Sequence, residues 1–327
     1  MRDRKILGNA LLILTAMIWG TAFVFQRTGM ESIEPITFNA ARMALAAVAV
    51  GAVSVVTAQA GKKRLSGAGT VVADSGESLS GSNEEGSGPG DETSGSWEEQ
   101  RRAYHRNTVI GGICCGTFLA AASIFQQMGI VYTTAGKAGF ITAMYMLLVP
   151  VIGTIFLHKR DSWIVWLAVL IGVAGMYLLC MTEGFRLTRG DTLVCICALL
   201  FSGHILCCDH FVQLCDPIRI SAIQFASCTV ISAVAAVILE QPTWDKIVSA
   251  AIPILYCGLI SGGLGYTLQI IAQKFTDPTI ASLLMSLESV FAVIAGALLL
   301  GERMSSRELL GCVVMFAAIV LVQIRGE

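Results

Sequence analysis

The chain has 327 residues, of which 55% are hydrophobic and 14% are charged, and its formal net charge is −1. A soluble protein carries roughly 25% charged residues, so this composition excludes an ordinary soluble domain and indicates a surface in contact with lipid. The small net charge argues against nucleic acid as a partner. The 11 cysteines lie mostly inside apolar runs and indicate neither a disulfide framework nor a metal site.

Ten apolar runs are long enough to cross a bilayer, whose roughly 30 Å hydrocarbon core needs about 20 helical residues. In chain order they are residues 6–25, 35–57, 108–132, 134–157, 163–181, 191–212, 217–239, 247–272, 278–300 and 307–324. The first run follows a basic segment but lacks a small-residue cleavage site, so we interpret it as a retained helix and not as a signal peptide. The sequence therefore predicts an all-α integral membrane protein of ten transmembrane helices.

Basic residues are unevenly distributed around the early spans. In the first half they gather before the first span, at 62–64, at 101–106 and at 159–160, all on one expected side of the membrane. The positive-inside rule predicts that this side is cytoplasmic, and an even number of spans returns the carboxyl terminus to it. The second half lacks this bias, and we let the first half decide because early helices usually dominate orientation.

Residues 58–106 interrupt the apolar pattern. Gly, Ser, Asp and Glu dominate the segment, and no basic residue occurs between Arg64 and Arg101. Such a composition buries too little apolar surface to offset the entropy lost on ordering, so we expect a disordered acidic cytoplasmic loop. A solvated tether is the simplest role for this loop, and a regulatory or docking role is the alternative.

The two halves of the chain are related to each other. Pro35 opens the second expected span, and Pro217 opens the seventh in a similar local sequence. Further along, Gln127 and Gln269 correspond to each other, but at a shorter spacing than the two prolines. The difference between the two spacings is close to the excess length of the acidic loop. One insertion in the first half therefore explains why the two halves align with different spacings before and after the loop.

Each half therefore contains five spans, an odd number, and the second half must enter the membrane inverted relative to the first. The sequence predicts a first repeat at 1–181, which contains the acidic loop, and a second repeat at 182–327. Inverted repeats are typical of secondary transporters, in which each half can adopt the conformation of the other.

Short motifs also recur along the chain in a fixed order. They include Trp19-Gly20-Thr21-Ala22-Phe23, Arg42, Gln127-Met128-Gly129-Ile130, Lys137-Ala138-Gly139-Phe140-Ile141-Thr142, Gly190-Asp191, His204, Tyr266-Thr267-Leu268-Gln269, Ser286-Leu287-Glu288 and Leu300-Gly301-Glu302-Arg303. In this order they resemble the EamA-type carriers of the drug/metabolite transporter superfamily. The resemblance implies a ten-helix inverted-repeat carrier with a central cavity, which exports small metabolites, often amino acids or their relatives.

Eight polar or aromatic side chains inside the expected spans are candidates for substrate binding. They are Trp19, Arg42, Gln127, Tyr145, His204, Tyr266, Gln269 and Glu288. A polar or ionisable group inside a bilayer is costly unless it faces a wet cavity or a partner, so each is a functional candidate.

Each candidate also has a structural alternative. Glu288 could bind a substrate ammonium or exchange a proton, or it could be a structural acid, and Arg42 could bind a carboxylate, pair with an acid or snorkel outward. His204 fits a proton relay or a satisfied buried histidine. The two glutamines could bridge helices or line the cavity, and the three aromatic residues could form its walls or pack in the core.

The segment 261–265 is rich in glycine and lies in the middle of the eighth expected span. One interpretation is close approach between helices. The other is a loosened helix whose backbone groups face the substrate, as in carriers with broken helices.

These features predict a secondary-active, alternating-access transporter in the cell (cytoplasmic) membrane that exports small polar metabolites such as amino acids. Coupling to protons or to a counter-substrate fits the pattern, and a homodimer is left open. The alternative is a non-transporting membrane sensor or scaffold that acts through the acidic loop. An intramembrane enzyme would need a catalytic constellation, and the sequence has neither a His-Glu-x-x-His motif nor a P-loop, so we expect no enzymatic activity, cofactor or metal.

Overall fold

A computed structural model describes residues 2–73, 91–132, 135–159, 161–180, 188–300 and 305–325, and over these residues the chain forms helices and no strands. The helices are α1 (Arg2–Gly29), α2 (Pro35–Ala73), α3 (Asp91–Ile130), α4 (Ala135–Ala143), α5 (Tyr145–Phe156), α6 (Trp163–Cys180), α7 (Arg189–Val212), α8 (Pro217–Leu239), α9 (Trp244–Ser249), α10 (Ala251–Leu255), the π-helix η1 (Tyr256–Tyr266), α11 (Thr267–Gln273), α12 (Pro278–Met285), α13 (Glu288–Leu300) and α14 (Ser306–Arg325).

Eight helical stretches within the described residues are long and apolar enough to span a membrane. They are Asp3–Gly29, Pro35–Ala60, Glu98–Ile130, Ala138–Phe156, Arg189–Val212, Pro217–Leu239, Ala251–Gln273 and Pro278–Leu299. Two shorter apolar helices, Trp163–Leu178 and Leu309–Val322, fall on the fifth and tenth runs expected from the sequence. The all-helical membrane architecture is therefore confirmed, whereas the count of ten spans stays a prediction.

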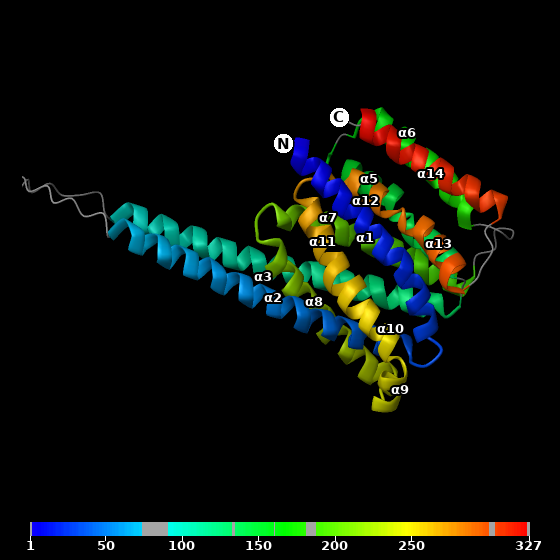
Figure 1. Ribbon diagram of the computed structural model, residues 1–327, viewed down its shortest axis with the longest axis horizontal. Coiled ribbons are helices and arrows are strands. Elements are labelled where there is room, and N and C mark those ends of the chain that lie inside the picture. The colour runs from blue at the N-terminus through cyan, green and yellow to red at the C-terminus, as the bar shows by residue number, and fades with distance from the viewer. Residues whose placement is uncertain are drawn as a thin grey trace, which may run out of the picture.

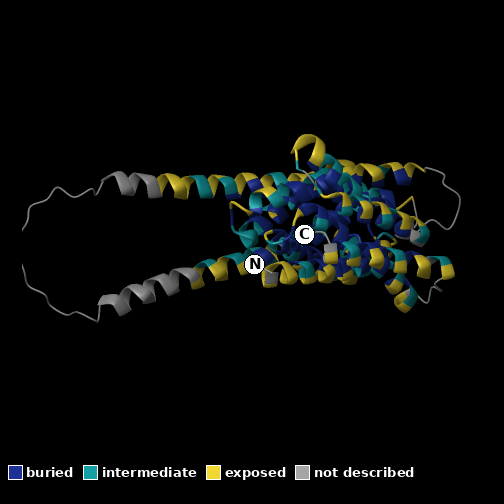
Figure 2. Cartoon of the chain, turned by 90° about the horizontal axis from the view of Figure 1, so that it is seen from above, coloured by how far each residue is buried: buried dark blue, intermediate teal, exposed yellow. Residues whose placement is uncertain are grey.

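Figure 2 shows which parts of the chain are buried and which are exposed, and many large apolar side chains are among the exposed residues. Large apolar side chains such as Val48, Val237 and Leu298 are exposed, the last of them to 79%. The buried polar side chains include Asn39, Arg42, Gln127, Gln224 and Glu288. Lipid accommodates the apolar surface, and the buried polar groups must satisfy one another or face a cavity.

Helices α2 and α3 continue well beyond their apolar parts and project together from the bundle (Figure 1). They make residues 58–73 and 91–106 helical, so the prediction of a disordered loop is wrong for these two stretches. Residues 98–106 consist largely of good helix formers, and Glu98 lies 3.7 Å from Arg102 one turn later, which favours helix over coil. Residues 74–90 of the expected loop, and 301–303 of the last family-like motif, lie outside the described residues.

Helix starts follow from local sequence. Asp216 caps α8 by accepting hydrogen bonds from the backbone N–H groups of Ile218 and Arg219, at 3.1 and 3.0 Å. Asp277 caps α12 in the same way, and a proline follows each aspartate at the first helical position. These Asp-Pro pairs fix where the seventh and ninth runs enter the bundle.

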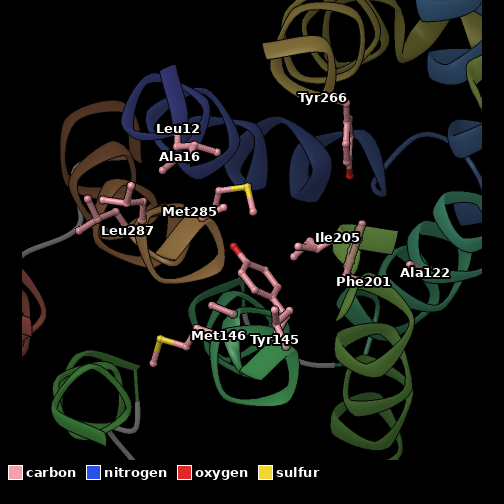
Figure 3. Packing of buried hydrophobic residues seen from close by; sticks show 14 of the residues in the cluster. Leu12, Ala16, Ala122, Tyr145, Met146, Phe201, Ile205, Tyr266, Met285 and Leu287 are labelled. Atoms are coloured by element: carbon pink, nitrogen blue, oxygen red, sulfur yellow. The ribbon is translucent and has the colours of Figure 1, made fainter. Parts of the chain in front are cut away.

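Packing between the helices follows a reciprocal pattern. Helix α1 packs against α13, η1 and α11, while α7 packs against α4, α5 and α3. Helices α2 and α8 pack on each other, and α3 also contacts α8. The pair α6 and α14 lies at the edge of the bundle (Figure 1). The core where α1, α3, α5, α7 and η1 meet is filled by Leu12, Ala122, Tyr145, Phe201, Tyr266 and their neighbours (Figure 3).

Two of the apolar runs are broken near their centres. Helix α4 ends at Ala143 and α5 begins at Tyr145, while α12 ends at Met285 and α13 begins at Glu288. Both breaks contain tightened backbone hydrogen bonds between residues three apart, such as Met144 N–H to Ile141 O at 3.2 Å and Leu287 N–H to Leu284 O at 3.3 Å. Tyr145 and Glu288 therefore stand at new helix starts inside the bundle.

Candidate functional site

A cavity with about 30 Å³ of space open to the centre of a water molecule lies between both halves of the chain. It is lined by Trp19, Phe23, Gln26, Arg42, Gln126, Thr142, Tyr145, Phe201, His204, Ile205, Ser261, Tyr266, Gln269 and Glu288. All the candidates expected from the sequence therefore line one cavity, with the single exception of Gln127.

Gln127 lies beside the cavity and bridges two helices. Its side-chain amide donates to the side-chain oxygen of Gln26, which joins α3 to α1. The adjacent Gln126 lines the cavity instead and donates to Thr142 Oγ1 at 3.3 Å. Consecutive residues on a helix point about 100° apart, and the sequence pattern did not resolve which glutamine faces inward.

Arg42 is the basic side chain of the cavity lining, and it is only 1% exposed. Its Nε donates to Asn39 Oδ1 at 3.0 Å, and the ring of Phe38 lies 5.9 Å from the guanidinium carbon. Its Nη2 atom is buried without a hydrogen-bond partner. A guanidinium that is neither paired nor snorkelling outward is placed to bind an anionic group in the cavity.

Glu288 is the acidic side chain of the cavity lining and is 3% exposed. It lies in the first turn of α13, where the partial positive charge of a helix start favours a carboxylate. The hydroxyl of Tyr145 donates to its Oε1 atom at 3.1 Å. This single bond ties the starts of α5 and α13 together, one from each half of the chain.

Aromatic side chains form one wall of the cavity. The rings of Trp19 and Tyr266 lie 4.7 Å apart, and Phe201 stacks on Tyr266 at 6.5 Å. The hydroxyl groups of Tyr145 and Tyr266 both point toward the space between the helices (Figure 3). The wall thus offers apolar faces for the body of a ligand and hydroxyl groups for its polar ends.

The glycine-rich segment is a π-helix, η1, which makes it both loosened and closely packed. Trp19 Nε1 donates to the backbone oxygen of Ser261 at 3.1 Å. A Cβ atom added to Gly265 would lie 2.7 Å from Trp19 Nε1, so only glycine permits this approach. The two interpretations of the sequence are therefore compatible, because a π-helix widens the backbone at the point where α1 packs against it.

His204 and Gln269 retain unused polar atoms. His204 Nε2 lies 3.1 Å from Gln224 Oε1 and 3.4 Å from Cys208 Sγ, while the buried Nδ1 has no hydrogen-bond partner among the described residues. Gln269 donates to Gln273 Oε1 at 3.1 Å, and its own oxygen has no partner. Each side chain is thus half satisfied by the protein.

Several lining residues were missed by the sequence analysis. Gln26 lies two helical turns after Trp19 along the same face of α1, and this spacing was an available signal. Asn39, which holds Arg42, lies one turn before it on α2. Phe201 and Ile205 carry no such signal, because apolar residues inside an apolar span do not reveal which way they face.

In the part of the chain that the structure describes, no group of three or more His, Cys, Asp or Glu side chains is placed to hold a metal ion.

Comparison with known proteins relates the chain to a family of transporters. The sequence model of the EamA-like transporter family matches residues 6–72, 94–181 and 188–324. A protein from Archaeoglobus fulgidus, described as an uncharacterized transporter, is 24% identical over 326 residues, which are 98% of this chain and 87% of the relative. A solved structure described only as the crystal structure of a protein has a TM-score of 0.69 at 14% identity, covers 97% of each chain and supports the fold.

Proposed function

The chain belongs to the EamA-like transporter family and is a membrane transporter, and we propose that it exports small polar metabolites, such as amino acids or related compounds, by secondary-active alternating access. The observation that carries this proposal is that a buried arginine and a buried glutamate line the same cavity. Arg42 and Glu288 come from different halves of the chain, and both line the cavity.

The two charges favour a ligand that carries both signs. A charge inside a membrane protein costs several kcal/mol unless it is solvated or paired. A ligand group of opposite charge offsets this cost when it binds. Arg42 presents a free donor for a carboxylate, while Glu288, which has one hydrogen bond, can accept an ammonium group or a proton. The aromatic wall then contacts the remainder of the substrate.

We further propose ten spans in two inverted repeats, 1–181 and 182–327, with both termini in the cytoplasm. The broken helices support this arrangement, because α4 ends at Ala143 and α12 ends at Met285, in the same register that pairs Gln127 with Gln269. The reciprocal packing of α1 and α7 also fits, and both chain ends lie on the side from which α2 and α3 project (Figure 1). Epitope tags before residue 6 and within 182–187 should lie on opposite sides of the membrane, and tags on the same side would refute the inversion.

The two repeats give a physical route to alternating access. Each half can take the packing of the other, so the cavity opens to one face and then to the opposite face. The sequence contains no P-loop motif for ATP hydrolysis, which leaves the proton gradient or exchange with a counter-substrate as the driving force. Glu288 is the group we assign to proton or ammonium binding.

Flux into and out of proteoliposomes tests the proposal. The purified protein is reconstituted and assayed with a panel of amino acids, nucleosides and amphipathic amines, with and without a proton gradient, beside protein-free liposomes. We expect saturable flux of amino acids, the class in this panel that bears both charges. Flux of none of these classes above the protein-free control would contradict the proposed function.

Deleting residues 66–98 separates a carrier from a sensor or scaffold that acts through the acidic segment. The cavity lining lies outside this stretch, so a carrier keeps its flux after the deletion. A scaffold would lose its function.

A further inference from the structure

A buried polar network joins three helices behind the cavity. Asn39 on α2 donates through its side-chain nitrogen to Ser123 Oγ on α3 and to Ser232 Oγ on α8, both at 2.9 Å. Its side-chain oxygen accepts from Arg42 Nε at 3.0 Å. All these side chains are buried, so water does not compete for the bonds.

Chemistry fixes the orientation of the amide. A guanidinium only donates hydrogen bonds, so the oxygen of Asn39 must face Arg42 and its nitrogen must face the two serines. The Ser123 hydroxyl, which accepts from Asn39, itself donates a hydrogen bond to Leu119 O at 2.6 Å. The amide is therefore held on both sides and cannot flip without breaking three bonds.

The network in turn sets the plane of the guanidinium. One edge of Arg42 is held at Nε, and the Phe38 ring lies near its carbon, while the buried Nη2 atom has no partner. Because the guanidinium is planar and rigid, the bond at Nε and the nearby Phe38 ring together restrict the directions of its other donors. The unused donor is thus held in place before any ligand arrives.

Within residues 188–300 and 305–325, the described part of the second half, the equivalent positions carry no such arrangement. In the register that aligns Pro35 with Pro217, the equivalents of Asn39 and Arg42 are Ser221 and Gln224. Gln224 contacts His204, and Ser221 Oγ is buried without a partner. The cation and the amide that holds it therefore come from the first half, while the second half contributes Ser232 to their support.

We propose that Asn39 is a positioning residue that presents the Arg42 guanidinium to the anionic group of the substrate. This inference rests on the proposed function for its physiological meaning, although the geometry of the pair can be tested without transport. Asn39 holds the cation through an uncharged oxygen, which supports the guanidinium without neutralising it. A carboxylate at this position would take the place of the substrate anion.

Arginine-specific labelling tests the placement directly. The purified protein is treated with phenylglyoxal, and labelling of Arg42 is followed by mass spectrometry, with the exposed Arg189 as internal standard. Asn39→Asp is nearly isosteric and should slow labelling of Arg42 by about tenfold or more, because a neighbouring carboxylate stabilises the unreactive protonated form. Asn39→Ser keeps a neutral oxygen and should not slow it.

Thr229→Val is the matched control, because Thr229 lies on α8 one turn from the network and its hydroxyl donates to Phe225 O on the same helix, at 2.7 Å. Labelling of Arg42 in the Thr229→Val variant should match that in the wild type. If Arg42 is not labelled in the wild type while Arg189 is, or if Asn39→Asp labels at the wild-type rate, the proposal is overturned. These results do not depend on finding a substrate, so they are distinct from failure of the proposed function.

A second measurement links the pair to recognition. L-phenylalanine and phenethylamine, which differ by the carboxylate, are compared as competitors of the best flux found in the proteoliposome panel. Asn39→Asp should weaken competition by L-phenylalanine about tenfold relative to competition by phenethylamine. Thr229→Val should leave the ratio of the two inhibition constants unchanged. An unchanged ratio in Asn39→Asp would overturn the role of Asn39 in presenting Arg42 to the substrate.

Discussion

The two charged ends of the cavity are built differently. Arg42 is supported by an amide and two serines from three helices, whereas Glu288 stands at a helix break and receives one bond, from Tyr145. The first charge is held by a rigid network, and the second by a contact that can be exchanged for another. We infer that the Arg42 end recognises the substrate and that the Glu288 end responds to it.

The difference also follows the helices. Asn39 and Arg42 lie within the unbroken helix α2, and their network continues into α3 and α8, which pack closely on one another. Tyr145 and Glu288 begin the short helices α5 and α13. Helix breaks are the places where a small change in backbone angles moves a side chain without unpacking a whole helix.

The largest expected effect comes from removing the fixed cation. Arg42→Gln should reduce flux of substrates with an anionic group by about 100-fold, because a charge-assisted hydrogen bond is worth about 1.5–3 kcal/mol. Initial rates in proteoliposomes at several substrate concentrations measure this loss. Flux within a few-fold of the wild type would contradict recognition at this end of the cavity.

A smaller effect is expected from Tyr145→Phe. This change removes the hydroxyl that bonds Glu288 while keeping the ring that packs in the core. Flux should fall by roughly tenfold, and its dependence on pH should change, because one hydrogen bond to a charged group is lost. Tyr256→Phe, which removes a hydroxyl bonded to Ile18 O outside the cavity lining, is the control. A pH profile identical to the wild type would show that the Glu288 end does not respond as inferred.

The adjacent glutamines repeat the contrast between support and binding on a smaller scale. Gln126→Leu should raise the KM of transport several-fold, because Gln126 lines the cavity. Gln127→Leu should instead lower stability by about 1 kcal/mol, because it breaks the bridge to Gln26 within the bundle. Flux kinetics and thermal unfolding in detergent separate the two, and the opposite assignment would mean that the helix is rotated.

The smallest effect belongs to an ion pair outside the cavity, between Glu34 and Lys246. The hydrogen bond from Lys246 lowers the pKa of Glu34, so the pair stabilises the fold above the ordinary pKa of a glutamate and loses this contribution as pH falls through the lowered value. Because the Lys246 side chain is 43% exposed and that of Glu34 is 32% exposed, water screens the pair and its contribution is about 1 kcal/mol or less. Lys246→Met should therefore reduce Tm slightly at pH 7 and not at all at strongly acidic pH. An equal loss at both pH values would assign the effect to packing.

Much of the fold could be predicted from the sequence because a bilayer imposes simple rules. Apolar runs located the helices, and the register between Gln127 and Gln269 matches the spacing of the two helix breaks at Ala143 and Met285. The helical extension at 58–73 and 91–106 was missed, because the prediction rested on the polarity of the segment. It did not consider that each stretch adjoins a transmembrane helix, from which a helix can propagate without a new nucleation step.

The cavity lining could be predicted mainly at positions where a polar or charged residue lies inside an apolar span. Arg42 and Glu288 stood out as charges inside apolar spans, and both line the cavity. Asn39 was missed because its role depends on Ser123 and Ser232, which are 84 and 193 residues away. Such long-range contacts cannot be deduced from spacing along a single helix.

The most direct test of the cavity as the transport site is the pH dependence of flux in Glu288→Gln proteoliposomes, beside the exposed-acid control Glu31→Gln. We predict that Glu288→Gln loses most of its flux together with its pH dependence, while Glu31→Gln keeps both. A Glu288→Gln protein with wild-type rate and pH profile would contradict the account.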